Sequence, residues 1–307
     1  MTEALRIYTH AHCLAHDPGP GHPEAAFRLE AVLNAVHALG HQALSAPLAT
    51  RAMLARAHST ALLDQLFAHE YSDVAMRIDP DTVLGPHSLS AALAAAGAGV
   101  AGVQDVLAGR ANRVFCAVRP PGHHATRAQA MGFCLLNSIA VAAYAALDAG
   151  VTRVSVVDFD VHHGNGTQDI FWHEPRVQYL SSHQAPLYPG TGGVNEHGAS
   201  GNIVNVPLPR MAGSELFRAA YTQSILPAID AFAPELILIS AGFDGHALDP
   251  LGGLNVSEDD FAWLTRALCQ QANRSAHGRV VSMLEGGYSA TALALCARAH
   301  LLALTDP

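Results

Sequence analysis

The chain has 307 residues, of which 50% are hydrophobic and 14% charged, a balance that predicts a globular protein with a large buried core and argues against disorder. Its formal net charge of -9, without any basic run, argues against a positively charged face for nucleic acid. The five cysteines include no C-x-x-C pair, which argues against a disulfide framework or a cysteine metal site and favours reduced thiols in the cytoplasm.

Apolar β-branched runs alternate with Ala- and Leu-rich stretches along the chain. The N-terminus lacks the basic and apolar regions of a signal peptide, and the longest apolar stretch, residues 91–103, is too short to span a bilayer, so we expect no membrane segment. The predicted strands are Leu5–Thr9, Arg113–Val118, Val154–Asp158, Val177–Leu180, Leu236–Ser240 and Arg279–Leu284. The predicted helices are Glu24–Ala38, Ser90–Leu107, Ser138–Ala149, Ser214–Phe232, Ser257–Ala276 and Ser289–Leu304, several of which open with a serine suited to N-capping. Apolar strands separated by helices predict one α/β domain over residues 1–307, built on a parallel sheet with helices on both faces.

Polar motifs follow four of these strands. They are Pro120-Pro121-Gly122-His123-His124, then Asp160, His162 and His163, then Ala241-Gly242-Phe243-Asp244, and finally Glu285-Gly286-Gly287-Tyr288. The carboxyl ends of parallel strands meet at one edge of the sheet, which is where open α/β sheets bind their ligands. We therefore expect the four motifs to form one functional site.

Asp160, His162 and Asp244 are the candidate metal ligands. Asp160 and His162 are two residues apart, so their side chains share one face of an extended segment. Asp244 completes a set of one imidazole and two carboxylates, and three protein ligands with one open position are typical of a catalytic zinc site. An isolated Asp-x-His is more often a helix cap or a buried hydrogen-bonded pair. The presence of the other motifs at the same edge of the sheet favours a metal site here.

His123 and His124 are candidates for proton transfer, because imidazole titrates near neutral pH. Each ring needs a partner that fixes its tautomer, and Asp158 and Asn165 flank the metal ligands in a position to supply one. An acidic partner raises the basicity of an imidazole, whereas the neutral amide of Asn165 leaves it nearer its ordinary value. A His-His pair alone is weak evidence, since loops often carry one.

Three aromatic residues suggest how a substrate is held. Tyr288 follows two glycines, which allow the backbone to approach a ligand closely, and its phenol is suited to stabilising an oxyanion. Phe133, after Gly132, and Tyr188 are candidates for the facing walls of a narrow apolar slot. A plain turn is the alternative for Gly-Gly-Tyr, and ordinary core packing is the alternative for Phe133 and Tyr188.

Together these motifs resemble the zinc-dependent histone deacetylase and acetylpolyamine amidohydrolase superfamily. The matching segments are His123-His124, Gly132-Phe133-Cys134, residues 158–166, residues 240–244 and Gly286-Gly287-Tyr288. The resemblance extends from His22-Pro23-Glu24 to Tyr288, and residues 160–168 and 249–253 look most like class II and bacterial members. It implies an arginase-like fold with one parallel sheet of about eight strands between helices, a Zn²⁺ cofactor and an acylated amine as substrate.

The resemblance also implies catalytic roles. Zinc is expected on Asp160, His162 and Asp244. His124 would be the main general base and acid, with Asn165 as a neighbour, and His123, paired with Asp158, its electrostatic partner. Tyr288 would donate a hydrogen bond to the substrate carbonyl and then to the oxyanion.

Further positions follow from the same resemblance. The acyl-lysine tunnel would be lined by Gly132, Phe133 and Tyr188, with Leu251 at its rim. A potassium ion is expected beside the zinc, at Asp158, Asp160, His162, Ser181 and Ser182.

The chain departs from the family pattern at the tunnel. Tyr188 replaces a common Phe, which narrows or polarises the slot. Leu251 stands where polyamine-selective relatives carry Glu, so we expect a preference for acyl-lysine or neutral substrates. The acidic rim residue that holds the substrate backbone is not fixed by the sequence, and its candidates are Asp73, Asp79 and Asp81.

Several alternatives stay open. The substrate could be an acetylated polyamine or another small amide or ester. One alternative is a dimanganese ureohydrolase of the arginase type. Its metal-binding motif has the order Asp-x-His-x-Asp, whereas the order here is Asp158-x-Asp160-x-His162, which argues against this alternative. A non-catalytic binding module would be expected to lose a ligand or Tyr288, and the sequence retains all of them. The sequence does not predict the oligomeric state.

Overall fold

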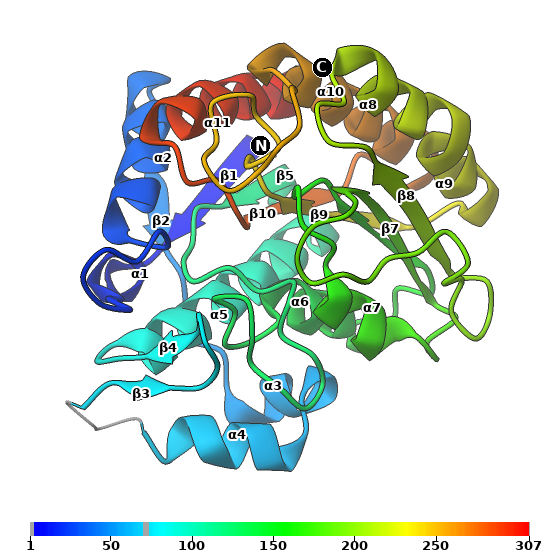
Figure 1. Cartoon of the computed structure of the whole chain (residues 1–307). Coiled ribbons are helices and arrows are strands. Elements are labelled where there is room, and N and C mark those ends of the chain that lie inside the picture. Colours follow the sequence, from blue (N-terminus) through cyan, green and yellow to red (C-terminus); the bar gives the residue numbers. More distant parts are fainter. Residues whose placement is uncertain (1–2, 70–73, 307) are drawn as a thin grey trace.

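The computed structural model describes residues 3–69 and 74–306, which form an α/β fold around one sheet (Figure 1). The sheet has eight strands in the order β2-β1-β5-β10-β9-β6-β7-β8, and every neighbouring pair is parallel. The expected architecture, a parallel sheet of about eight strands between helices, is therefore confirmed. The strands are β1 (Glu3–Thr9), β2 (Ala43–Ser45), β5 (Ala111–Cys116), β6 (Val154–Asp158), β7 (Val177–Gln184), β8 (Ile203–Leu208), β9 (Leu236–Ala241) and β10 (Val280–Leu284).

Helices cover both faces of the sheet. Figure 1 shows α2, α10 and α11 on one side and α5 and α6 on the other. The helices are α1 (Ala11–Ala15), α2 (Ala26–Ala38), α3 (Arg51–Ala57), α4 (Thr60–Phe67), α5 (Ser88–Leu107), α6 (Ser138–Asp148), α7 (Asn165–Phe171), α8 (Ser214–Ala220), α9 (Leu226–Phe232), α10 (Glu258–Ser275) and α11 (Ala290–Thr305). The predicted helix over residues 214–232 is interrupted by a π-helical turn, Tyr221–Ile225.

Serine caps two of the predicted helices. Ser257 forms a capping box with Asp260 at the start of α10, and the Ser289 hydroxyl accepts the backbone N–H of Ala292 at the start of α11. The serine expectation is wrong for three helices. His87 is the N-cap of α5, the Asn137 side chain accepts the N–H of Ala140 at the start of α6, and Gly213 is the N-cap of α8.

The apolar helix α5 is packed inside the domain. It has 20 residues and is apolar enough by composition to cross a membrane, but 89% of its most apolar window is buried against the rest of the protein. A Cβ on Gly97 would lie 1.8 Å from the carbonyl oxygen of Pro47, so only glycine lets that loop approach the helix. The composition of α5 therefore reflects close packing in the core.

The strand register brings the polar motifs to one edge. Met283 of β10 pairs with Cys116 of β5 and with Ser240 of β9, which in turn pairs with Asp158 of β6. These four strands thus end level with one another. A two-stranded antiparallel hairpin, β3 (Met76–Arg77) with β4 (Val83–Leu84), lies outside the main sheet.

Candidate active site

Asp160, His162 and Asp244 converge at the carboxyl edge of the sheet. Their ligand atoms all lie within 4.8 Å of one another. The Nδ1 atom of His162 is 3.1 Å from Oδ1 of Asp160 and 3.1 Å from Oδ2 of Asp244. Both carboxylates are fully buried. The predicted ligand trio is thus assembled from the segments that follow β6 and β9.

Backbone N–H groups and glycines position the two carboxylates. Asp160 accepts the N–H of Gly286 at 2.8 Å, and Asp244 accepts the N–H of Val161 at 2.8 Å. A Cβ on Gly286 would lie 2.1 Å from Oδ2 of Asp244, so this glycine leaves space for the ligand cluster. In the described part of the chain no arginine forms an ion pair with either carboxylate. Two buried carboxylates and an imidazole with no arginine paired to them suit a divalent metal ion such as zinc.

Protonation in this cluster reflects the crowding of charge. Burial, together with the Asp160 carboxylate, raises the pKa of Asp244 to about 7. Burial disfavours the charged form of His162, but its hydrogen bonds to Asp160 and Asp244 outweigh that effect and raise its pKa to about 10. The two carboxylates therefore need a positive charge between them, which a proton on His162 or a metal ion supplies.

The two histidines form separate pairs, as the sequence predicted. His123 Nδ1 lies 3.0 Å from Oδ2 of Asp158, and His124 Nδ1 lies 2.8 Å from Oδ1 of Asn165. Burial opposes charge on His123, but Asp160 and Asp158 outweigh it and raise its pKa well above the ordinary value. Burial, reinforced by His123 and His162, lowers the pKa of His124 well below its ordinary value. His123 is therefore suited to be charged, and His124 to be neutral and able to accept a proton.

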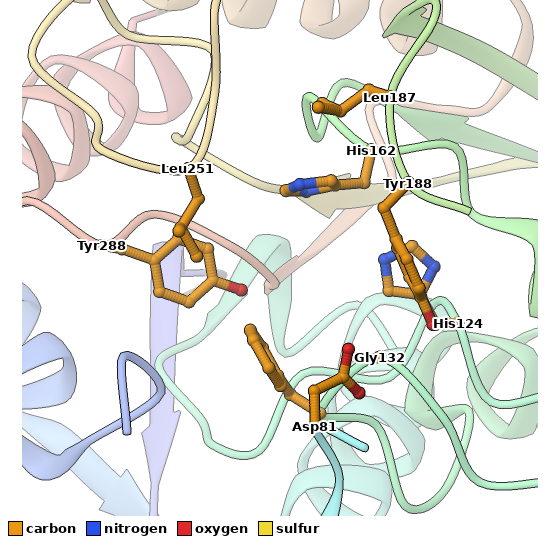
Figure 2. Close-up of a pocket in the computed structure, with 9 residues that line it drawn as sticks. Asp81, His124, Gly132, His162, Leu187, Tyr188, Leu251 and Tyr288 are labelled. Carbon is orange, nitrogen blue, oxygen red and sulfur yellow. The ribbon is translucent and has the colours of Figure 1, made fainter. Parts of the chain in front are cut away.

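Tyr288 faces this group across the pocket. Figure 2 shows its hydroxyl pointing toward the same space as the rings of His124 and His162. Burial raises the pKa of the phenol well above its ordinary value, so the hydroxyl stays protonated and can donate a hydrogen bond. The guanidinium of Arg28 lies 4.8 Å from the centre of the Tyr288 ring and donates to the carbonyl oxygen of Gly287.

The predicted tunnel residues line one pocket with these groups. Its volume is about 230 Å³, and the lining consists of Asp81, His124, Gly132, Phe133, His162, Leu187, Tyr188, Leu251 and Tyr288 (Figure 2). The Phe133 ring centre is 5.8 Å from that of Tyr288, and the Tyr188 ring centre is 5.1 Å from that of His124. The positive φ of Gly132, 57°, suits glycine, and a Cβ there would lie 2.6 Å from the His124 ring. An apolar slot thus leads to the polar cluster.

Among the rim candidates, Asp81 lines the pocket. Asp79 is not among the lining residues, and its carboxylate instead accepts the backbone N–H groups of Asp81 and Thr82 in the turn of the hairpin. Asp73 lies outside the described residues.

The serines expected at the potassium site have protein partners. The Ser181 hydroxyl is 2.9 Å from Nδ1 of His183, and the Ser182 hydroxyl is 2.6 Å from the hydroxyl of Tyr221. Asp158 accepts hydrogen bonds from Tyr179 and from the backbone of Asp160 in addition to its contact with His123. The potassium ion stays a prediction.

Two buried acids that the sequence reasoning did not assign hold the site together. Glu285 accepts the N–H groups of Gly122 at 2.6 Å and of His123 at 3.2 Å, and the hydroxyl of Ser240 at 3.0 Å. It therefore joins the ends of β5, β9 and β10. Burial raises its pKa to about 7. The sequence does show an acid directly after the apolar strand β10, which could have marked Glu285 as a site residue. Two of the groups that Glu285 binds are backbone N–H groups, and no sequence motif reveals those.

Asp249 plays a similar part at the rim. Its Oδ2 accepts the N–H groups of Tyr288 at 2.6 Å and of Ser289 at 3.2 Å, while its Oδ1 accepts the N–H of Leu251 at 2.9 Å. One carboxylate thus positions both the catalytic candidate Tyr288 and the rim candidate Leu251.

Comparisons with known proteins agree with this geometry. A family model described as the histone deacetylase domain matches residues 22–304. A histone deacetylase-like amidohydrolase of Pseudomonas aeruginosa is 36% identical, over 96% of this chain and 84% of its own length. A probable deacetylase of Archaeoglobus fulgidus is 36% identical, over 92% of this chain and 81% of its own length. The crystal structure of the HDA15 HD domain matches with a TM-score of 0.94 and 34% identity, covering 99% of this chain and 89% of that one. These matches confirm the resemblance, and the chain belongs to the histone deacetylase family of deacetylases and amidohydrolases.

Proposed function

We propose that this protein is a zinc-dependent deacylase that hydrolyses the amide of an acyl-lysine or a similar acylated amine. The observation that carries the proposal is an apolar slot lined by His124, His162 and Tyr288, in which His162 belongs to the Asp160–His162–Asp244 trio. The lowered pKa of His124 and the raised pKa of Tyr288, both caused chiefly by burial, suit a proton acceptor and a hydrogen-bond donor. A zinc ion bound by the trio would polarise the amide carbonyl and lower the pKa of a bound water to about 7.

His124 acts as the proton carrier. The Asn165 oxygen can only accept, so Nδ1 of His124 carries the hydrogen and Nε2 keeps its lone pair for a proton from water. The same atom then returns the proton to the leaving amine. Burial, reinforced by a charged His123 that Asp158 fixes, keeps the pKa of His124 low and so favours that return.

Tyr288 supplies the hydrogen bond to the carbonyl oxygen and to the oxyanion that replaces it. Its donor role needs no change of protonation, because burial keeps the phenol neutral. Asp249 fixes its backbone and Arg28 lies against its ring, so the donor is held in place before the substrate arrives.

Leu251 and Asp81 bear on the substrate class. Leu251 offers an apolar contact at the slot, which suits a lysine stem, and Asp81 offers a carboxylate that can accept backbone N–H groups of a peptide. Asp81 also favours the second candidate, an acetylpolyamine amidohydrolase, because a carboxylate at the mouth attracts a secondary ammonium group.

A turnover screen tests the proposal. The zinc-loaded protein is given acetyllysine peptides, longer acyl-lysine peptides and acetylated polyamines, and acid release is measured. Highest kcat/KM on an acyl-lysine peptide supports the proposal, and highest kcat/KM on an acetylated polyamine selects the second candidate. Release from none of these substrates would refute both.

A further inference from the structure

A second hollow opens beside the tunnel mouth. Its volume is about 450 Å³, and it shares Asp81 and Phe133 with the catalytic slot. We name it the Arg77 groove after its cation and define it by Pro18, Pro20, Pro23, Arg77, Pro80 and Asp81. Because the two cavities share the wall formed by Asp81 and Phe133, a substrate chain that leaves the slot past Asp81 can enter this groove.

The walls of the Arg77 groove are fixed to the slot. The backbone N–H of Phe133 donates to the Thr82 hydroxyl at 3.0 Å, which ties the β3–β4 hairpin to the tunnel wall. On the other side, Nε2 of His22 lies 3.0 Å from the carbonyl oxygen of Asp81. Four prolines line the groove. Because their backbones are already restricted, the groove loses less conformational entropy when a ligand binds.

The groove carries one positive group. The Arg77 guanidinium donates to the carbonyl oxygen of Pro80, so it is held beside the residue that precedes Asp81. No carboxylate of the described residues forms an ion pair with Arg77, whereas Arg51, Arg56 and Arg218 each pair with an aspartate on a neighbouring helix. Asp81 at the mouth and Arg77 in the groove therefore present opposite charges to a bound chain.

We propose that the Arg77 groove is a substrate subsite that binds an acidic side chain one or two residues from the acyl-lysine. Asp81 accepts a backbone N–H of the peptide, and Arg77 pairs with the carboxylate of the neighbouring residue. A residue adds about 3.3–3.6 Å to an extended chain, so one or two residues lead from the Asp81 carboxylate into the groove. The inference rests on the proposed deacylase function and narrows its substrate class to acidic acyl-lysine peptides.

The expected preference is modest, because Arg77 is exposed. A surface ion pair typically changes a binding constant by roughly two- to fivefold. The preference should appear in KM and not in kcat, since the contact is remote from the reacting bond, and it should shrink as ionic strength rises.

Matched peptides test the subsite. Acetyllysine peptides that differ only by Glu or Gln at each of the two positions on either side of the lysine are compared by kcat/KM. The enzymes are the wild type, Arg77→Met, which keeps an apolar stem and loses the charge, and Arg298→Met. Arg298 is an exposed residue of α11 without a described ion pair, so its variant matches the change in net charge.

We expect the wild type and Arg298→Met to prefer Glu over Gln at one position by two- to fivefold through KM, and Arg77→Met to lose that preference. Equal kcat/KM for Glu and Gln peptides at all four positions in the wild type would overturn the subsite while leaving the deacylase function intact. A Glu preference that survives in Arg77→Met would overturn it as well. Absence of turnover with every peptide would instead refute the proposed function, and the subsite with it.

Discussion

Replacing Asp249 with asparagine is a sharp test of how Tyr288 is positioned. Both carboxylate oxygens of Asp249 are in use, Oδ2 by the N–H groups of Tyr288 and Ser289 and Oδ1 by that of Leu251. An asparagine amide keeps one acceptor oxygen and turns an NH₂ group toward the other donors. The variant must therefore leave either the Leu251 N–H or the Tyr288 and Ser289 N–H groups facing a donor.

The structure sets the size of the effect. Asp249 is buried, and a buried donor without a partner costs about 1–3 kcal/mol. If the hydrogen bond from the Leu251 N–H is lost, we expect the free energy of unfolding to fall by about 1–3 kcal/mol. If the bonds from the Tyr288 and Ser289 N–H groups are lost, we expect a fall of up to about twice that. A displacement of a catalytic group by about 1 Å costs about 10²-fold in rate. The expected fall in kcat/KM is therefore about 10- to 100-fold.

Steady-state deacylation, metal content and urea denaturation are measured for Asp249→Asn and for Asp259→Asn, an exposed carboxylate of α10 that serves as the control. We expect the Asp249 variant to retain its metal and lose mainly kcat, and the control to match the wild type. A variant with wild-type kcat and unchanged unfolding free energy would refute the idea that Asp249 positions Tyr288.

Three further predictions concern the oxyanion donor, the pH dependence of stability and the rim. Tyr288→Phe should keep its metal and lose roughly 10²–10³-fold in kcat, and a loss under about threefold would remove Tyr288 from catalysis. His58 is buried between the Thr126 carbonyl and the Asn137 N–H, and burial lowers its pKa to about 4. The unfolded chain therefore binds the extra proton between pH 6.5 and 4, so stability falls as pH falls through that window by about 1.4 kcal/mol per unit for this group. Urea midpoints at pH 7, 6 and 5 should fall less steeply in His58→Gln, and equal slopes would contradict the assignment. Leu251→Glu should raise the ratio of kcat/KM for an acetylated polyamine to kcat/KM for an acetyllysine peptide by at least about fivefold. The reason is that opposite charges about 4 Å apart interact by about 1 kcal/mol in water. An unchanged ratio would show that Leu251 does not select the substrate.

The sequence predicted those parts of the fold whose residues signal their own structure. The run Val154–Asp158 is β6 with the predicted bounds, because four apolar or small residues end at a buried acid. The edge strands β2 and β8 were not predicted. β2 has only three residues, two of them exposed, and β8 contains Pro207, which an edge strand tolerates but which weakens a strand pattern.

The site residues were predictable where a polar or charged residue comes directly after a predicted strand. Asp160 and Asp244 come from different strands, and the shared edge of a parallel sheet was sufficient to expect them together. The sequence could not distinguish Asp81 from Asp79 as the rim residue. The position of Asp81 is set by the β3–β4 hairpin, which the sequence does not predict. Glu285 and Asp249 bind backbone N–H groups, whose positions arise only when distant segments pack.

Metal content and acetate release, measured together on the wild type and on Asp244→Ala, show directly whether the trio holds a catalytic zinc ion. We expect about one zinc per wild-type chain, loss of acetate release on chelation, and its return when zinc is restored. We expect Asp244→Ala to fold but neither to retain zinc nor to release acetate, because one of three ligands is missing. Full zinc occupancy in that variant, or undiminished acetate release by the metal-free wild type, would refute a zinc-dependent deacylase built on these residues.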